Sequence, residues 1–426
     1  MTAQSSDGAA RRAERADERR MALAREWDEL VERVRGTSGF EDFLRPPGLD
    51  DLLPAARGGP VVLVNISRWR CDAVIVTLRG VRVTPLGDLT SAEVQQRAEG
   101  YLALLRAVEQ AVRELLLARR AFENSAPTLE ATRRHSAASR ALRQARDTME
   151  SGLTDLAAWM GDRITGPALE TLGIHDAPAP GEAYPRVWWC PTGLLNLLPL
   201  HAAGHHSPAP AGVAPRTVID RAVSSYTPTL RALLEASRPG RPPGHGDPRM
   251  LVVALAETPG ELPLPAVNTE RDLLTGLFAD RHTLLEGRAA TWDAVRAGPA
   301  RHPWVHFSCH GDQDLSDPSR GGLLLSDRVL TVQDVAAGHH RGEFAFLSAC
   351  KTATGGLTLT DEVITLAAAL HDPVHRIPAR HRHPVVRLRP VGRGRVRHGV
   401  RGAHGGRALL PGPVRARAAH RDPATA

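Results

Sequence analysis

The spacing of apolar residues divides the chain into two kinds of region, which meet near residue 250. Residues 8–35, 90–123 and 128–160 carry apolar side chains three and four positions apart, the spacing of one helix face. Residues 59–86 instead hold three short runs rich in valine and isoleucine, which is typical of strands. The first region is therefore predicted to be α+β, with a β-meander followed by a long helical pair.

Beyond residue 248, short apolar runs alternate with helical stretches. The predicted strands are 249–255, 282–287, 304–311 and 344–350, and the predicted helices are 265–278, 289–298, 331–338 and 359–370. Alternating strands and helices form a mostly parallel sheet with helices on both faces. This region is therefore predicted to be a three-layer α/β sandwich.

The composition changes again at His371. Residues 371–426 hold 13 arginines, two acidic residues and no Phe, Trp or Tyr, and they show no regular apolar period. Such a segment cannot bury a core. With the Pro- and Gly-rich stretch at 238–248 as a boundary, we predict an N-terminal helical segment at 1–45, a meander and hairpin domain at 46–240, a strand–helix domain at 248–370 and a disordered basic tail at 371–426.

The tail has the composition expected of an out-of-frame translation of GC-rich DNA. One lysine against 53 arginines indicates a GC-rich genome, and a shifted frame in such DNA encodes Arg, Pro, Gly, Ala and His. One set of synonymous codons for residues 371–392, read one base later, encodes a β-rich segment with a Leu-Trp-Ser-Val run. We therefore predict a frameshift after Leu370; the alternative is a disordered basic tail in the correct frame.

Charge and cysteine content argue against several classes of protein. The net charge is +7, but the tail contributes +11, which leaves −4 on the first 370 residues and disfavours a specific nucleic-acid partner. The four cysteines include no CxxC pair, which disfavours a zinc site or a disulfide scaffold. The chain lacks an apolar signal segment and a membrane-spanning run. We expect a cytoplasmic protein without membrane contact, metal or other cofactor.

A histidine and a cysteine stand at the ends of two predicted strands, forty residues apart. His310 ends the apolar run VHFSCH, and Cys350 ends FLSAC. Because chemistry collects at the carboxyl ends of parallel strands, neighbouring strands would bring imidazole and thiol together. The histidine would then act as a general base for a thiolate nucleophile, and the backbone N–H groups of Gly311 and Cys350 would bind an oxyanion. The alternative is a buried structural cysteine.

Strand alternation assigns roles to the neighbours of His310. Cys309 points to the opposite face and is expected in the core, whereas His306 shares the face of His310 at a deeper position.

Trp69 and the pair Trp188-Trp189 are also expected in the core.

Four acidic residues follow the two strand ends. Asp312 and Asp314 lie in the loop after His310 and are expected to be solvated or to contact substrate. Asp361 and Glu362 begin the last predicted helix, where they either complement its N-terminus or form a pocket for a basic substrate side chain.

At these residues the chain resembles a known family. The motifs VHFSCHG and FLSACKTATG, followed by Asp361-Glu362 and LAAAL, look like the CHAT domain, a caspase-like family related to separase. Residues roughly 45–370 are covered, including the earlier segments VWWCPTGLLNLLPLHAA and LPLPAVNTERDLL. The resemblance implies a caspase-like sandwich, a dyad of His310 and Cys350 with Gly311 as oxyanion support, and peptide-bond cleavage in a regulated bacterial system.

The chain departs from this family after the last predicted helix. The family continues with a strand that carries a Leu-Trp-Ser-Val-type motif and helps to build the substrate pocket, and here that motif occurs only in the shifted frame. We therefore expect an impaired cysteine endopeptidase, whose partners are a protein or peptide substrate and a regulatory protein. The alternative is a non-catalytic interaction or regulatory module of the same fold.

Overall fold

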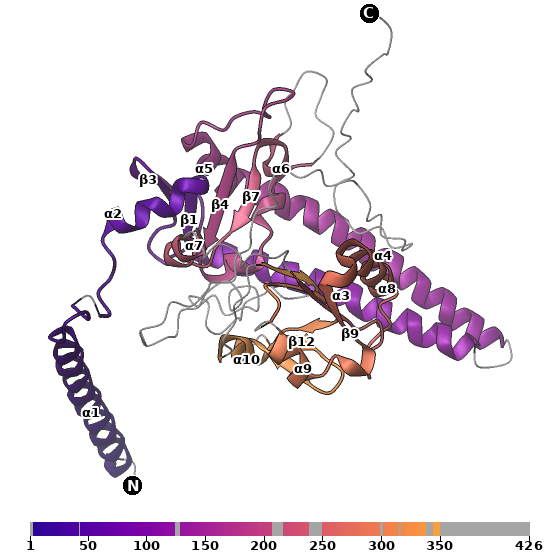
Figure 1. The fold of residues 1–426 in the computed structure, drawn as a ribbon, viewed down its shortest axis with the longest axis horizontal. Helices are drawn as coiled ribbons and strands as arrows, with labels where there is room; N and C mark the ends of the chain where they lie inside the picture. The colour runs from indigo at the N-terminus through magenta and orange to yellow at the C-terminus, as the bar shows by residue number, and fades with distance from the viewer. Residues whose placement is uncertain are drawn as a thin grey trace, which may run out of the picture. The chain divides into compact units, whose positions relative to one another are not determined.

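The computed structural model describes residues 3–41, 43–123, 128–206, 216–237, 249–298, 301–314, 317–337 and 344–349. The chain forms two compact units, Met1–Leu52 and a second that begins at Leu53. The first unit contains α1 (Ala3–Arg35), which is the helix predicted at 8–35, and the short α2 (Leu49–Leu52) (Figure 1). The four sequence-based domain boundaries stay predictions.

The second unit begins with a five-stranded sheet in the order β3-β2-β1-β4-β7. β1 (Val61–Asn65), β2 (Asp72–Thr77) and β3 (Gly80–Pro85) form the predicted antiparallel meander. β4 (Arg186–Pro191) and β7 (Val223–Tyr226) extend it by parallel pairing. A separate two-stranded ladder pairs β5 (Gly204–His205) with β6 (Arg216–Thr217).

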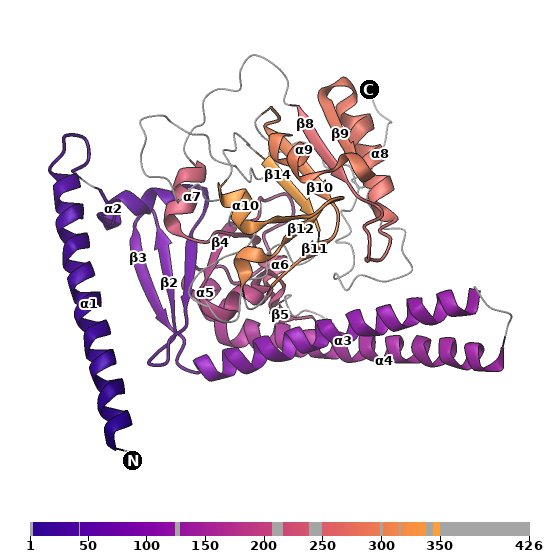
Figure 2. The same cartoon turned by 90° about the horizontal axis from the view of Figure 1, so that it is seen from below.

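The predicted helical pair is α3 (Ser91–Glu123) and α4 (Leu129–Met160), which lie side by side along their length (Figure 2). The indole N–H of Trp159, near the end of α4, donates a hydrogen bond to Glu93 in the first turn of α3 at 2.6 Å. Shorter helices follow at α5 (Gly166–Thr171), α6 (Val218–Arg221) and α7 (Leu230–Ser237).

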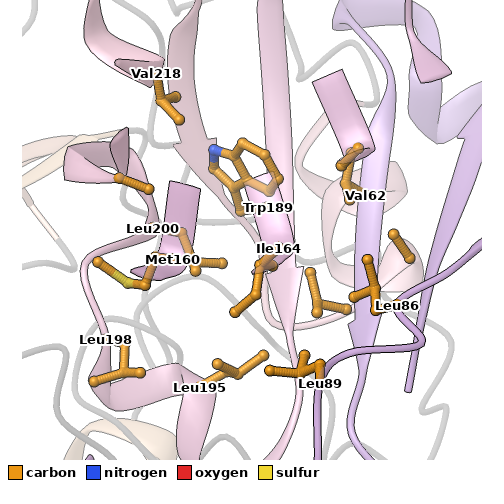
Figure 3. Packing of buried hydrophobic residues seen from close by; sticks show 14 of the residues in the cluster. Val62, Leu86, Leu89, Met160, Ile164, Trp189, Leu195, Leu198, Leu200 and Val218 are labelled. Carbon is orange, nitrogen blue, oxygen red and sulfur yellow. The ribbon is translucent and has the colours of Figure 1, made fainter. Parts of the chain in front are cut away.

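Apolar side chains pack on both faces of the five-stranded sheet because successive residues of a strand point to opposite sides. On one face the fully buried Trp189 packs among Val62, Met160 and Leu200 (Figure 3). On the other face Val61, Val76 and Cys190 pack against Leu233 of α7.

The expectation that Trp69 lies in the core is wrong. Its side chain is 79% exposed, on the turn that joins β1 to β2, with the Arg68 guanidinium 4.2 Å from its ring centroid. The residue stands beyond the last paired residues of both strands, Asn65 and Asp72, so the strand alternation that would direct it inward does not reach it.

A four-stranded sheet carries the strand–helix pattern predicted beyond residue 248. Its strands are β8 (Met250–Ala254), β9 (His282–Glu286), β10 (Trp304–Ser308) and β14 (Phe344–Ser348), all parallel, in the order β14-β10-β8-β9. Figure 2 shows β10 and β14 next to each other within this sheet.

Helices cover both faces of this second sheet. α8 (Ala266–Phe278) packs on one face through Leu274 and Phe278. α9 (Trp292–Ala297), the hairpin of β12 (Gly322–Leu324) and β13 (Val329–Thr331), and α10 (Val332–Ala337) cover the other. The predicted α/β fold with a mostly parallel sheet and helices on both faces is therefore confirmed.

The helix predicted at 359–370 and the tail at 371–426 lie outside the described residues. Among the helices that the structure describes, none combines the length and apolar character needed to cross a bilayer.

Candidate active site

His310 lies two residues past the carboxyl end of β10, the strand between β8 and β14. The order of the sheet reverses here, because β9 follows β8 on one side while β10 and β14 are added on the other. Parallel α/β sheets bind their ligands at such switch points, outside the carboxyl ends of the strands. The half-buried ring of His310 therefore lies where this fold places a site.

A backbone carbonyl fixes which nitrogen of His310 carries the proton. Nε2 lies 2.7 Å from the carbonyl oxygen of Leu262. A carbonyl only accepts hydrogen bonds, so Nε2 must be the donor, and in the neutral ring Nδ1 keeps the lone pair. Nδ1 is consequently the atom of His310 that can take a proton from another group.

The loop that supplies this carbonyl is itself constrained. Leu262 precedes Pro263, and a residue before proline is restricted to extended conformations. The Leu264 N–H donates to the carbonyl of Ala256 at 2.7 Å and the Glu261 N–H to that of Thr258 at 3.1 Å. The acceptor for His310 is thus held by a closed loop between β8 and α8.

Gly311 begins the short strand β11 (Gly311–Asp312), which pairs with β12. The Leu324 N–H donates to the His310 carbonyl at 2.9 Å, so Gly311 and Leu323 form a non-hydrogen-bonded pair of this antiparallel ladder. The Gly311 N–H therefore points away from β12. This ladder does not use the Gly311 N–H, and the oxyanion role expected for it stays a prediction.

Cys350 lies outside the described residues, as do Asp361 and Glu362, so their predicted roles stay predictions. The strands in question are nevertheless neighbours. β10 pairs with β14 in parallel at an offset of forty residues, from Trp304 opposite Phe344 to Ser308 opposite Ser348.

The two loop acids differ in their surroundings. Asp312 is exposed, whereas Asp314 is half-buried, and its carboxylate accepts a hydrogen bond from the Asp317 N–H at 3.0 Å. Asp314 therefore helps to shape the loop after His310. The proposed substrate contact of either acid stays a prediction.

A buried polar cluster lies directly below His310, on the same face of the sheet. The Glu270 carboxylate of α8 accepts three hydrogen bonds, from the Ser308 hydroxyl (2.5 Å), from the Ser348 hydroxyl (2.8 Å) and from Nε2 of His306 (3.1 Å). The His306 ring also stacks on Phe346, with centroids 4.8 Å apart and planes tilted by 6°. One side chain of α8 thereby joins β10 to β14.

Strand alternation places His306 on the correct face, but the sequence pattern alone did not lead to Glu270. The signal was present, because His306 and Ser308 are buried polar residues in an otherwise apolar strand and the half-buried Ser348 stands opposite Ser308. Buried polar groups require partners, so these three residues implied one shared acceptor on the covering helix.

The environment shifts the pKa of both ionisable members of the cluster. Burial is the largest single influence on Glu270 and favours the neutral form, but the hydrogen bonds from Ser308, His306 and Ser348 together outweigh it and lower its pKa. Burial lowers the pKa of His306, against the opposing effect of the Glu270 carboxylate. The cluster therefore holds an ionised Glu270 and a neutral His306 near pH 7.

We expect acid to destabilise this part of the fold in two stages. A lowered His306 pKa means that the unfolded chain protonates first, so stability is lost as the pH falls from about 6.5 toward the folded-state pKa. The Glu270 contribution is lost at lower pH, below about 4.5. Thermal unfolding midpoints between pH 7 and 4 measure this, and His306→Gln should flatten the upper stage. An unchanged slope in that variant would contradict the assignment.

The described cysteines are structural. Cys309 is 1% exposed in the core on the face opposite His310, as expected from strand alternation, and burial raises the pKa of its thiol to about 12. Cys190 is likewise buried with a pKa of about 12, and Cys71 is buried in the first sheet. The raised pKa of Cys190 and Cys309 makes these two thiols poor nucleophiles at neutral pH.

Within the described ranges, no group of three or more His, Cys, Asp or Glu side chains is arranged to hold a metal ion. The expected absence of a metal or other cofactor stays a prediction.

The comparison with known proteins identifies a family for the region that contains β4 and β7 of the first sheet and the whole described second sheet. A sequence model of the CHAT domain matches residues 154–372, just over half of the chain. The match runs from the end of α4 past every described strand of the second sheet, and it ends beside His371, where the composition changes. A search of curated proteins gives no match.

Proposed function

Because this chain belongs to the CHAT domain family, which is caspase-like and related to cysteine peptidases, we propose that His310 and Cys350 form a catalytic dyad that cleaves peptide bonds. The substrate is then a protein or peptide, and the thiol is the nucleophile. This assignment goes further than family membership and depends on the geometry around His310.

The observation that carries the proposal is the register of β10 and β14. Opposite residues differ by forty in number, and so do His310 and Cys350. If this register continued for two residues past Ser308 and Ser348, His310 and Cys350 would stand opposite each other on the same face. Their backbones would then be about 5 Å apart, the spacing of neighbouring strands. That separation suits proton transfer between a thiol and an imidazole.

The proposed reaction follows from which nitrogen of His310 carries the proton. Nε2 donates to Leu262, so Nδ1 takes the proton from the Cys350 thiol. The thiolate attacks the peptide carbonyl carbon, and the Gly311 N–H donates to the developing oxyanion. The imidazolium then protonates the leaving amine, and water hydrolyses the thioester with Nδ1 again acting as base.

Four acids are proposed as pocket residues: Asp312, Asp314, Asp361 and Glu362. Carboxylates around the strand ends would favour a basic side chain on the substrate next to the cleaved bond.

Alkylation by iodoacetamide tests the dyad without knowledge of the substrate. An ordinary thiol is only a few per cent ionised at pH 7, whereas a thiolate paired with an imidazolium is mostly ionised. His310→Ala is therefore expected to slow the alkylation of Cys350 by about 10- to 30-fold. Peptide mass spectrometry follows each thiol, and Cys190 and Cys309 serve as slow internal references because their pKa is about 12. Equal rates in both proteins would refute the dyad.

The composition of the tail supports a second candidate function for the chain as it stands. We propose that the catalytic domain comprises residues 248–370, packed with the domain at 46–240, and that residues 371–426 are translated out of frame. A protein lacking the following strand would keep the fold as a non-catalytic interaction or regulatory module in the cytoplasm. The nucleotide sequence around codon 370 tests this directly, because codons that do not permit the alternative reading would exclude it.

A further inference from the structure

The carboxylate of Glu270 bridges the two strands whose ends carry the proposed dyad. We propose that Glu270 is a positioning residue, which holds β10 and β14 together at their carboxyl ends and so sets the distance between imidazole and thiol. This inference rests on the proposed function, since it concerns the geometry of the same site.

The contacts of Glu270 span both strands at one level. Oε2 accepts from Ser308 at 2.5 Å and Oε1 accepts from Ser348 at 2.8 Å. Ser308 and Ser348 are directly opposite each other in the sheet. The two serines stand two residues before His310 and Cys350 respectively, so the bridge is the last such contact before the strand ends.

An ionised carboxylate accepts from all three of these partners at once. Three donors converge on two oxygens, and the Glu270 side chain is only 21% exposed. Hydrogen bonds to a charged acceptor are stronger than those between neutral groups. A glutamine would present an N–H₂ group in place of one oxygen. With that group toward Ser308 and His306, the donating Nε2 of His306 would lose its acceptor; with it toward Ser348, the Ser348 hydroxyl would have to turn and accept in place of donating.

Glu270 also connects the strands to the carbonyl that orients His310. Leu262, which accepts the hydrogen bond from Nε2, lies eight residues before Glu270, in the loop that leads directly into α8. The single segment 262–270 therefore contacts His310 at one end and both strands at the other. Loss of the bridge would free β14 to shift relative to β10 while the Leu262 contact keeps His310 on the side of α8.

The test compares Glu270→Gln with Asp272→Asn in the full chain. Asp272 lies on the same helix, is exposed and pairs with Arg271, so its substitution removes a carboxylate of α8 away from the strands. Alkylation of Cys350 by iodoacetamide is measured between pH 5 and 9, together with the thermal unfolding midpoint. Glu270→Gln is expected to slow alkylation at pH 7 by about tenfold and to move the midpoint of the pH profile toward that of an ordinary thiol. Asp272→Asn should reproduce the wild-type profile.

A purely structural role would lower the unfolding midpoint of Glu270→Gln and leave the pH profile of the folded protein unchanged, which would overturn the inference. If that variant does not fold, Ser348→Ala removes one donor and keeps the carboxylate, and a profile identical to wild type would likewise overturn it. Failure of the proposed function gives a different pattern, because His310→Ala would then leave the alkylation of Cys350 unaltered. If alkylation of Cys350 is slow in His310→Ala but as fast as wild type in Glu270→Gln, the positioning role is rejected and the dyad is retained.

Discussion

Restoring the reading frame after Leu370 is expected to raise peptide-bond cleavage at least about a thousandfold above that of the chain as printed. A misplacement of the reacting groups by about 1 Å can cost about a hundredfold in rate, and loss of the strand that aligns the substrate is expected to cost more. The physical reason is that the second sheet would gain a further strand in place of a segment without aromatic residues or apolar period. Without that strand, the dyad would lack the wall against which a substrate backbone is aligned.

The measurement uses the two purified proteins, with autoproteolysis on denaturing gels and fluorophore-labelled casein as readouts. Cys350→Ala in the restored chain is the control and should return the rate to background. His310→Ala should do the same. Equal cleavage by the 426-residue chain and the frame-restored chain would contradict the prediction. Activity that survives Cys350→Ala would contradict it as well.

Trp189→Ala is expected to destabilise the protein by about 3–5 kcal/mol, the range for removal of a large buried aromatic side chain. Trp189 is fully buried among Val62, Met160 and Leu200 (Figure 3), and its indole N–H donates to the Ser224 hydroxyl at 3.0 Å. The substitution leaves a cavity in the first sheet and removes the partner of Ser224. Denaturant unfolding followed by circular dichroism measures the free energy.

The matched control is Trp69→Ala, which removes the same side chain from an exposed turn. Its effect should stay within about 0.5 kcal/mol, as for most surface substitutions. A similar loss of stability in both variants would show that Trp189 does not pack as described.

Local patterns were sufficient to predict most elements of the fold. The meander of β1 to β3, the pair α3 and α4, and the parallel strands of the second sheet each carry an unambiguous period over enough residues. Alternation along β10 and into the residue that follows it also assigned Cys309 to the core and His306 to the opposite face correctly. Trp69 was misplaced because a large aromatic residue was expected to be buried, whereas it lies on the turn beyond the paired residues of β1 and β2.

The candidate site was harder to predict, since its supporting contacts involve residues distant in the sequence. The bond from His310 to Leu262 spans 48 residues and ends on a backbone oxygen, which leaves no trace in residue type. Glu270 is recognised only when Ser308 and Ser348 are known to be opposite each other. Motifs indicated the proposed dyad, whereas the contacts of Leu262 and Glu270 became visible only in the structure.

The choice of a main-chain oxygen as the partner of His310 has a consequence for how this protein tolerates change. No substitution of the Leu262 side chain removes that backbone oxygen, so residue 262 can vary in sequence without altering the imidazole tautomer. The neighbouring Pro263 has no such freedom, since its ring restricts the direction in which the carbonyl points. The tautomer of His310 therefore depends on the path of the polypeptide at a proline and only weakly on which side chain stands at position 262.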